Sequence, residues 1–301
     1  MNVIKEIQKL KKDLNAVILV HNYQLPEVQD IADYRGDSLG LSVAASKTKA
    51  DVIVFCGVHF MAETAKIISP QKTILIPDKN AGCPMADMIT IEQLRSLKQK
   101  HPNAKIICYV NSSAEVKAES DICCTSANAI AVAQNAFTDD DEIIFIPDRY
   151  LGSYTKAQTG RNIILTSGYC PTHAKILPEH VLAAKEKYPN SEILVHPECN
   201  SAVIKLSDQV LSTGGMEKYV KKSKSTRFII GTEEGIIYRL KQDNPDLEFF
   251  PISNIAICPN MKLTNLAKVH ASLKEKKFEV TLPNEIIKKA KKSIMAMLDY
   301  V

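Results

Sequence analysis

The 301-residue sequence has little net charge and no long apolar segment. Its 38 lysines and arginines against 34 aspartates and glutamates leave a formal charge of +4, and no basic block is interleaved with aromatic residues. This composition argues against a nucleic-acid partner and is compatible with a small anionic substrate. The N-terminal stretch is charged, and the five apolar residues that follow it, Ala16 to Val20, are too few for a signal peptide or a membrane span. We therefore expect a cytoplasmic protein that binds neither nucleic acid nor membrane.

The eight cysteines do not form a local zinc-binding pattern. Structural zinc ions are usually held by pairs of cysteines two residues apart, and the sequence contains no Cys-x-x-Cys. A reducing compartment also argues against a disulfide framework, which leaves metal ligation, catalysis or burial as roles for the thiols. With 45% hydrophobic residues, the chain can bury the cores of two or three small domains.

Three Cys-Pro dipeptides stand at nearly equal intervals along the chain. Their cysteines, Cys83, Cys170 and Cys258, are 87 and then 88 residues apart. Three further sets of residues recur at offsets of 88 and 87: His21, Tyr109 and His196; Asp33, Asp121 and Asp208; and Ser38, Ser126 and Thr213. Because four sets share nearly one period, we infer a threefold repeat that contributes one thiolate from each copy.

Each copy has the pattern of a small α/β unit. Its apolar runs are short, continuous and bounded by turn residues, which is typical of parallel strands covered by helices on both faces. We expect strands at 17–20, 51–55 and 73–76, then at 106–110, 142–146 and 163–165, and then at 193–195, 228–230 and 247–251. The predicted fold is α/β, with three pseudo-threefold-related αβα domains at 1–88, 89–174 and 175–283. An amphipathic helix at about 284–301 is expected to pack back on the first domain.

The recurring polar residues and the cysteines all follow predicted strands. In parallel α/β units the carboxyl ends of the strands form the ligand-binding edge, so we expect these residues to share one edge. Helices that begin at Ser38, Ser126 and Thr213 would add hydroxyl caps and outward-pointing N–H groups, which bind anions. If the three edges face one axis, the three Cys-Pro cysteines converge on one point.

Three thiolates that meet in a cytoplasmic protein indicate a metal centre. An iron-sulfur cubane fits them better than structural zinc, which needs four closed ligands. Three cysteines leave one of four irons open to a substrate hydroxyl or carboxylate, whereas electron-transfer clusters usually have every position filled. An open iron is a Lewis acid suited to the elimination of water.

The sequence resembles the quinolinate synthase family along its whole length. The matching segments are His21-Asn22-Tyr23-Gln24, Gly36-Asp37-Ser38-Leu39, Gly57-Val58-His59-Phe60-Met61-Ala62-Glu63-Thr64, Gly82-Cys83-Pro84-Met85, Tyr109-Val110-Asn111, His196-Pro197-Glu198-Cys199 and Cys258-Pro259-Asn260-Met261. The resemblance implies a triangle of three homologous α/β domains around a central 4Fe-4S cluster. It also implies the condensation of iminoaspartate (iminosuccinate) with dihydroxyacetone phosphate to quinolinate, phosphate and two waters in NAD biosynthesis, and a functional link to an enzyme that produces iminoaspartate.

The resemblance further implies the site residues. The cluster ligands fall on Cys83, Cys170 and Cys258, with the fourth iron open to substrate. The substrate-binding positions are His21, Tyr23, Ser38, Tyr109, Asn111, Ser126, His173, His196, Glu198, Ser212 and Thr213. Among these, Glu198 is our candidate base, and Tyr23 and His21 are candidate acids or positioning groups, because condensation and enolisation need proton transfers near neutral pH. Residues 212–215 are our candidate phosphate cradle.

Simpler interpretations remain for several residues. Hydroxyls at helix starts are most often ordinary caps, and the recurring aspartates are read as structural turn or cap residues. The other cysteines, Cys56, Cys108, Cys123, Cys124 and Cys199, are read mainly as small buried apolar residues. Two other function classes stay open: a redox or iron-sensing protein with the same cluster, and a hydro-lyase that uses the open iron on another hydroxy acid.

Overall fold

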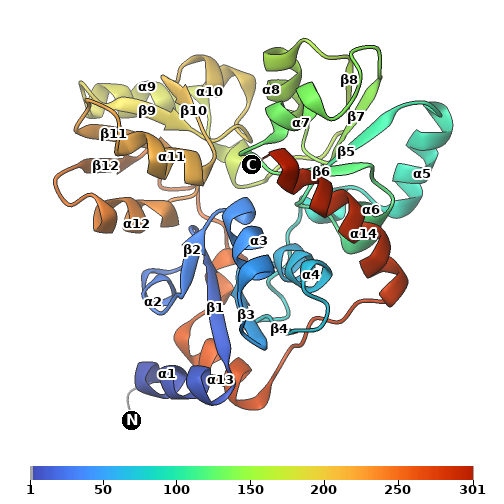
Figure 1. Ribbon diagram of the computed structural model, residues 1–301. Helices are drawn as coiled ribbons and strands as arrows, with labels where there is room; N and C mark the ends of the chain where they lie inside the picture. Colours follow the sequence, from blue (N-terminus) through green and yellow to red (C-terminus); the bar gives the residue numbers. More distant parts are fainter. Residues whose placement is uncertain (1–2, 301) are drawn as a thin grey trace.

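The computed structural model describes residues 3–300 and contains three parallel four-stranded sheets (Figure 1). The strands are β1 (Ala16–His21), β2 (Tyr34–Gly36), β3 (Val52–Cys56) and β4 (Thr73–Leu75); β5 (Lys105–Tyr109), β6 (Ile122–Cys124), β7 (Ile143–Ile146) and β8 (Ile163–Leu165); and β9 (Glu192–Val195), β10 (Gln209–Val210), β11 (Arg227–Gly231) and β12 (Glu248–Pro251). Their orders are β2-β1-β3-β4, β6-β5-β7-β8 and β10-β9-β11-β12. The same order recurs in each sheet, so the predicted α/β architecture with parallel sheets is confirmed. We call the parts of the chain that carry the three sheets the first, second and third units.

Helices connect the strands and repeat with them. They are α1 (Val3–Asp13), α2 (Pro26–Gln29), α3 (Ser38–Lys47), α4 (His59–Ile68), α5 (Ile91–Lys100), α6 (Ala114–Ala118), α7 (Ala129–Asn135), α8 (Arg149–Thr159), α9 (Pro178–Lys187), α10 (Ser201–Lys205), α11 (Thr213–Val220), α12 (Gly235–Asp243), α13 (Leu266–Glu275) and α14 (Asn284–Met297). Short 3-10 turns occur at η1 (Ala86–Met88), η2 (His173–Lys175), η3 (Met261–Leu263) and η4 (Leu298–Tyr300). Each of the first three turns begins three residues after a Cys-Pro cysteine, so the loops that carry the cysteines share one local structure.

Each unit contains four strands, one more than the three that we expected. The missed strands β2, β6 and β10 are only two or three residues long and lie at the edge of each sheet. β2 and β10 are also only partly buried. A strand of two or three residues is too short for its sequence pattern to be recognised.

The recurring aspartates attach these edge strands to the sheets. Asp33, Asp121 and Asp208 each accept a hydrogen bond from the backbone N–H of the neighbouring central strand, at 2.7, 2.7 and 2.8 Å. The backbone N–H of each aspartate donates to the carbonyl of that same residue, at 3.0, 3.2 and 2.9 Å. The aspartates therefore satisfy backbone groups where each edge strand begins, and their structural interpretation is confirmed.

Helices α13 and α14 leave the third unit and pack elsewhere (Figure 1). α13 packs against α1 and β3, and residues 278–280 bond to the edge strand β4, so part of the range expected in the third domain lies on the first unit. α14 contacts α4 of the first unit, but it packs mainly on α6 and β6 of the second. Ser293 Oγ, for example, donates to the carbonyl of Lys117 at 2.8 Å. The helix expected on the first domain thus joins the first two units.

Candidate functional site

One cavity of about 180 Å³ lies where the carboxyl ends of the strands of all three units meet. His21 and Tyr109 are the last residues of β1 and β5, and His196 directly follows β9. All three side chains line the cavity, as do Cys83, Cys170 and Cys258 from the three Cys-Pro loops. The threefold pattern of the sequence therefore corresponds to a convergence of side chains in space.

The three Cys-Pro cysteines differ from the other five in their exposure. Cys83, Cys170 and Cys258 are partly exposed to the cavity, whereas Cys56, Cys108, Cys123, Cys124 and Cys199 are fully buried. Burial, with a smaller contribution from the charge of Cys258, raises the pKa of Cys83 to about 12. Burial likewise raises the pKa of Cys170, with added contributions from Glu198 and Cys83. Such thiols become thiolates most readily when a bound metal supplies positive charge, so this donor set fits a metal centre.

Glu198 contacts three other polar side chains of the cavity. It is buried, and Tyr109 Oη donates to its Oε1 at 2.6 Å. Its Oε2 lies 2.7 Å from His173 Nδ1 and 3.6 Å from His196 Nδ1. Burial alone would raise the pKa of Glu198, but the two histidines and the hydrogen bonds from His173 and Tyr109 lower it. The side chain is therefore an ionised carboxylate at neutral pH.

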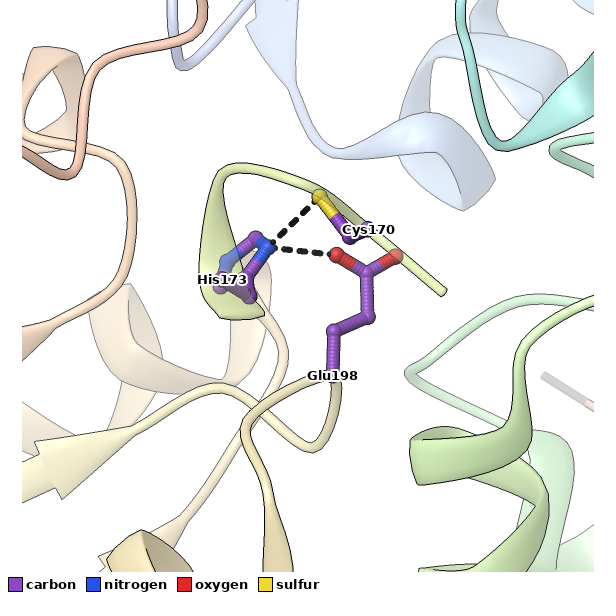
Figure 2. Close-up of side chains that lie close together, drawn as sticks. All are labelled: Cys170, His173 and Glu198. Atoms are coloured by element: carbon purple, nitrogen blue, oxygen red, sulfur yellow. Dashed lines mark hydrogen bonds and ion pairs between the residues drawn. The ribbon is translucent and has the colours of Figure 1, made fainter. Parts of the chain in front are cut away.

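Glu198 and His173 also approach one of the Cys-Pro cysteines. Figure 2 shows His173 Nδ1 between the Glu198 carboxylate and Cys170 Sγ, which is 3.1 Å from the nitrogen. The three donor atoms lie within 4.8 Å of one another, so these residues could also contribute to a metal site. The distances around Nδ1 are those of hydrogen bonds, and the ring therefore links the carboxylate to the cysteine loop.

Two histidines and two tyrosines of the cavity are neutral at pH 7. Burial lowers the pKa of His21 and of His196 to about 3, although the charge of Glu198 opposes this effect. Burial and Glu198 raise the pKa of Tyr23 and of Tyr109 well above the usual range. The Glu198 carboxylate thus lies among these neutral hydrogen-bonding rings.

Ser38, Ser126 and Thr213 line the cavity but do not cap the helices as expected. Asp37 caps α3 by accepting from Gly40 N at 2.8 Å, and Ser212 caps α11 by accepting from Gly215 N at 3.1 Å. α7 begins only at Ala129, three residues after Ser126, and His196 Nε2 lies 3.1 Å from the Ser126 hydroxyl. The preceding polar residue performs the capping in α3 and α11, so the hydroxyls of Ser38 and Thr213 remain on the cavity wall.

The candidate phosphate cradle at 212–215 is not favoured by this arrangement. Ser212 does not line the cavity, and its hydroxyl already accepts the Gly215 N–H. A Cβ atom on Gly214 would lie 2.6 Å from Asp37 Oδ2, so a carboxylate of the first unit already stands against the start of α11. A second anion at this helix start would meet repulsion from Asp37.

The remaining expected residues lie where the sequence predicted them. Tyr23, Asn111 and His173 line the cavity. Asn111 Oδ1 is buried without a hydrogen-bond partner and is therefore available to a ligand N–H or O–H. Sequence reasoning missed Thr232, whose hydroxyl lies 2.6 Å from Tyr23 Oη and 2.7 Å from His173 Nε2, because it belongs to none of the recurring sets.

Comparison with known proteins agrees with this site. Residues 5–299 match the family described as quinolinate synthetase A protein. The chain belongs to this family. It is 52% identical over 296 residues to a quinolinate synthase of Dehalococcoides mccartyi strain CBDB1, covering 98% of this chain and 97% of that protein. It is 54% identical over 293 residues to the quinolinate synthase of Geobacter sp. strain M21, covering 97% and 96%. For quinolinate synthase 1 of Methanosarcina acetivorans, the identity is 52% over 297 residues, covering 99% and 97%.

Membership of the quinolinate synthetase A family makes this chain an enzyme and agrees with the chemistry of the cavity. The partly exposed cysteines and the adjoining Cys170, His173 and Glu198 group are compatible with an iron-sulfur cluster. Within residues 3–300, no helix has the length and apolar character needed to cross a membrane.

The buried histidines of this quinolinate synthetase A chain predict acid destabilisation. His21 and His196 have folded-state pKa values of about 3, while an unfolded histidine titrates near 6.5. Below about pH 6.5 the unfolded chain therefore binds more protons. We expect the free energy of unfolding to fall with pH down to about 3, by up to ~1.4 kcal/mol per pH unit for each histidine. Denaturant titrations between pH 7.5 and 4.5 measure this slope, and the variant His21→Gln should reduce it. An equal slope in that variant would contradict the effect.

Proposed function

We propose that this enzyme condenses iminoaspartate with dihydroxyacetone phosphate to give quinolinate, phosphate and two waters, for NAD biosynthesis. The observation that carries the proposal is the meeting of Cys83, Cys170 and Cys258 in the cavity that also holds Glu198. The ionised Glu198 and the neutral rings around it suit a reaction with several proton transfers. The names of the similar proteins support the same reaction.

The cofactor in this proposal is one 4Fe-4S cluster, held by Cys83, Cys170 and Cys258. When bound, such a cluster with one iron free of protein ligands supplies a Lewis acid for the removal of hydroxide. The fully buried cysteines, of which Cys108 and Cys199 are examples, do not line the cavity and are not ligands in this proposal. His173 would hold the Cys170 loop in place through its hydrogen bond at 3.1 Å.

The chain's own residues would orient the substrates and move protons. Glu198 is ionised and lies between hydrogen-bonding rings, so we assign it the role of base. Tyr23 and His21 are the acids or positioning groups in this proposal. The free Asn111 oxygen would accept a hydrogen bond from the substrate imine or hydroxyl, and Ser38, Ser126 and Thr213 would contact carboxylate or phosphate oxygens.

We make three further proposals, on the source of a substrate, on the location of the chain and on its domain ranges. Iminoaspartate is unstable in water, so an enzyme that produces it from aspartate would have to supply this one. Such a metabolic role places the chain in the cytoplasm. We also retain 1–88, 89–174 and 175–283 as approximate domain ranges, except that α13 and α14 pack outside the third unit.

The test is an anaerobic assay on protein reconstituted with iron and sulfide. We expect a brown protein that forms quinolinate from the two named substrates and loses this activity in air. A cluster-loaded protein that forms no quinolinate would reject the proposed reaction. If it instead dehydrates one compound of a hydroxy-acid panel, the alternative hydro-lyase is favoured, and inactivity on every substrate favours a redox or iron-sensing role.

A further inference from the structure

Glu233 is a buried carboxylate at the cavity wall that belongs to none of the recurring sets. Both of its oxygens have donors from the third unit. Oε1 accepts the backbone N–H of Cys258 at 3.1 Å and lies 2.9 Å from Lys262 Nζ. Oε2 accepts the backbone N–H of Gly235 at 2.8 Å. The carboxylate therefore holds the Cys-Pro loop of Cys258 beside the start of α12.

Lys262 extends this contact to the first unit. Its ammonium group pairs with Glu233 and also donates to the backbone carbonyl of Tyr23 at 2.5 Å. Only 19% of the Lys262 side chain is exposed and none of the Glu233 side chain, so the ion pair is shielded from solvent. A Cβ atom on Gly235 would lie 2.8 Å from Lys262 Nζ and from Tyr23 O, so these groups close tightly around the start of α12. The ion pair thus joins the loop of Cys258 to the segment that carries Tyr23.

Side-chain donors hold the backbone on both sides of Tyr23. Gln29 Nε2, from the same unit, lies 3.2 Å from Asn22 O and 2.9 Å from Gln24 O. It also lies 3.0 Å from a carbonyl of the third unit, at residue 235. This amide has two hydrogens for three carbonyl groups, whereas Lys262 offers a charged donor to Tyr23 O. Lys262 is therefore the stronger of the two links from this segment to the third unit.

The lysine of this contact is particular to the third unit. One backbone hydrogen bond recurs beside all three Cys-Pro loops, at 2.8, 2.8 and 3.1 Å, and its acceptor always stands two residues before the cysteine. The donors are His59, Arg149 and Glu234, and the acceptors are Ala81, Gly168 and Ala256. Four residues after the cysteines, however, stand Asp87, Ala174 and Lys262. The repeated fold thus holds each loop through its backbone, and the third unit adds a cationic side chain at this position.

We propose that Lys262 and Glu233 are a positioning pair for the condensation: they hold the backbone of Tyr23 in a fixed place relative to the loop of Cys258. This inference rests on the proposed function, because the two segments carry a candidate acid and a candidate cluster ligand of that reaction. Without the ammonium group, Tyr23 O loses its charged donor, and Glu233 is left as a buried carboxylate without its cation. A displacement of about 1 Å in a reacting group can slow a reaction by about 100-fold.

The experiment replaces Lys262 by methionine, which removes the charge and the hydrogen bonds but keeps an unbranched side chain. Lys268→Met is the matched control, since Lys268 also combines an ion pair, at 2.5 Å from Asp78 Oδ2, with a bond to a backbone carbonyl, at 2.7 Å from Leu263 O. None of these control residues lines the cavity. Iron content, visible absorption, KM and kcat are measured for each anaerobically reconstituted protein. We expect Lys262→Met to keep its iron and a KM within about threefold but to lose about 30- to 100-fold in kcat, and Lys268→Met to keep kcat within about threefold.

Two double-mutant cycles separate positioning from general stability. If the two residues act as a pair, adding Glu233→Gln to Lys262→Met should cost little further kcat. If they act through Tyr23, Lys262→Met should cost far less in kcat once Tyr23→Phe has removed the phenol. Additive losses in either cycle, or an undiminished kcat in Lys262→Met, would overturn the proposal.

Iron uptake distinguishes this proposal from two other results. If Lys262→Met takes up no iron, Lys262→Gln replaces it in the same measurements. Loss of iron in both variants would also overturn the proposal, because the pair would then hold the cluster and not the reacting groups. Wild-type protein that holds a cluster but forms no quinolinate would reject the proposed function itself, whereas an active wild type with an undiminished Lys262→Met rejects this inference alone.

Discussion

Replacing Cys83, Cys170 or Cys258 singly by serine should abolish quinolinate formation and remove most of the bound iron. Each of these cysteines comes from a different unit and is partly exposed to the same cavity. A serine hydroxyl is a far weaker iron ligand than a thiolate, and even the loss of an outer-shell partner typically costs about 10- to 100-fold in metal affinity or activity. We therefore expect at least a 100-fold loss of activity, measured together with iron content and visible absorption after anaerobic reconstitution.

The buried cysteines provide matched controls for this experiment. Cys56 and Cys108 are fully buried in β3 and β5 and do not line the cavity. Replacing either by alanine removes a small apolar group, so about 1–2 kcal/mol of stability should be lost while the cluster is retained. A full complement of iron in all three serine variants would refute the ligand assignment.

The variant Glu198→Gln should lose about 100- to 10,000-fold in kcat, the usual contribution of a general acid or base. The amide has the shape of the carboxylate, so Tyr109 can still donate to its oxygen. However, its NH₂ group would face His173 Nδ1, which now lies 2.7 Å from a carboxylate oxygen. The variant thus removes the negative charge of Glu198 and reverses a hydrogen bond, while all three cysteines remain. Single-turnover rates of the cluster-loaded protein give the measurement.

Glu217→Gln is a suitable control for the Glu198 variant. Glu217 is partly buried and accepts a hydrogen bond from Asn22 Nδ2 at 2.6 Å, but it does not line the cavity. It should retain wild-type kcat. If Glu198→Gln retained its iron and reacted at the wild-type rate, Glu198 could not be the base.

Much of the architecture could be predicted because it repeats. The central strands β1, β5 and β9 are continuous apolar runs, and each ends at a member of the set His21, Tyr109 and His196 or directly before it. The equal spacing of the cysteines further predicted their convergence in one cavity, where all three are found. Such a convergence can be predicted from a sequence because the same structural unit occurs three times along the chain.

The details that were missed depend on single contacts. Ser38 was expected to cap a helix, but Asp37, one residue earlier, has the geometry to do so. Thr232 belongs to none of the recurring sets, so no repeat could indicate it. α13 and α14 return to earlier units because their apolar faces pack there, and an amphipathic pattern does not specify its partner.

The residues that line the cavity are spread along most of the chain, which affects when the cavity can form during translation. The lining residues extend from His21 to Met261, and α14, which joins the first two units, comes later still. Domains generally fold as they emerge from the ribosome, N-terminal parts first. The first two sheets can therefore form while the third is still being made, but no nascent chain shorter than about residue 261 can enclose the cavity. Cofactor loading would then follow translation, and until then Cys83 and Cys170 would face solvent as free thiols.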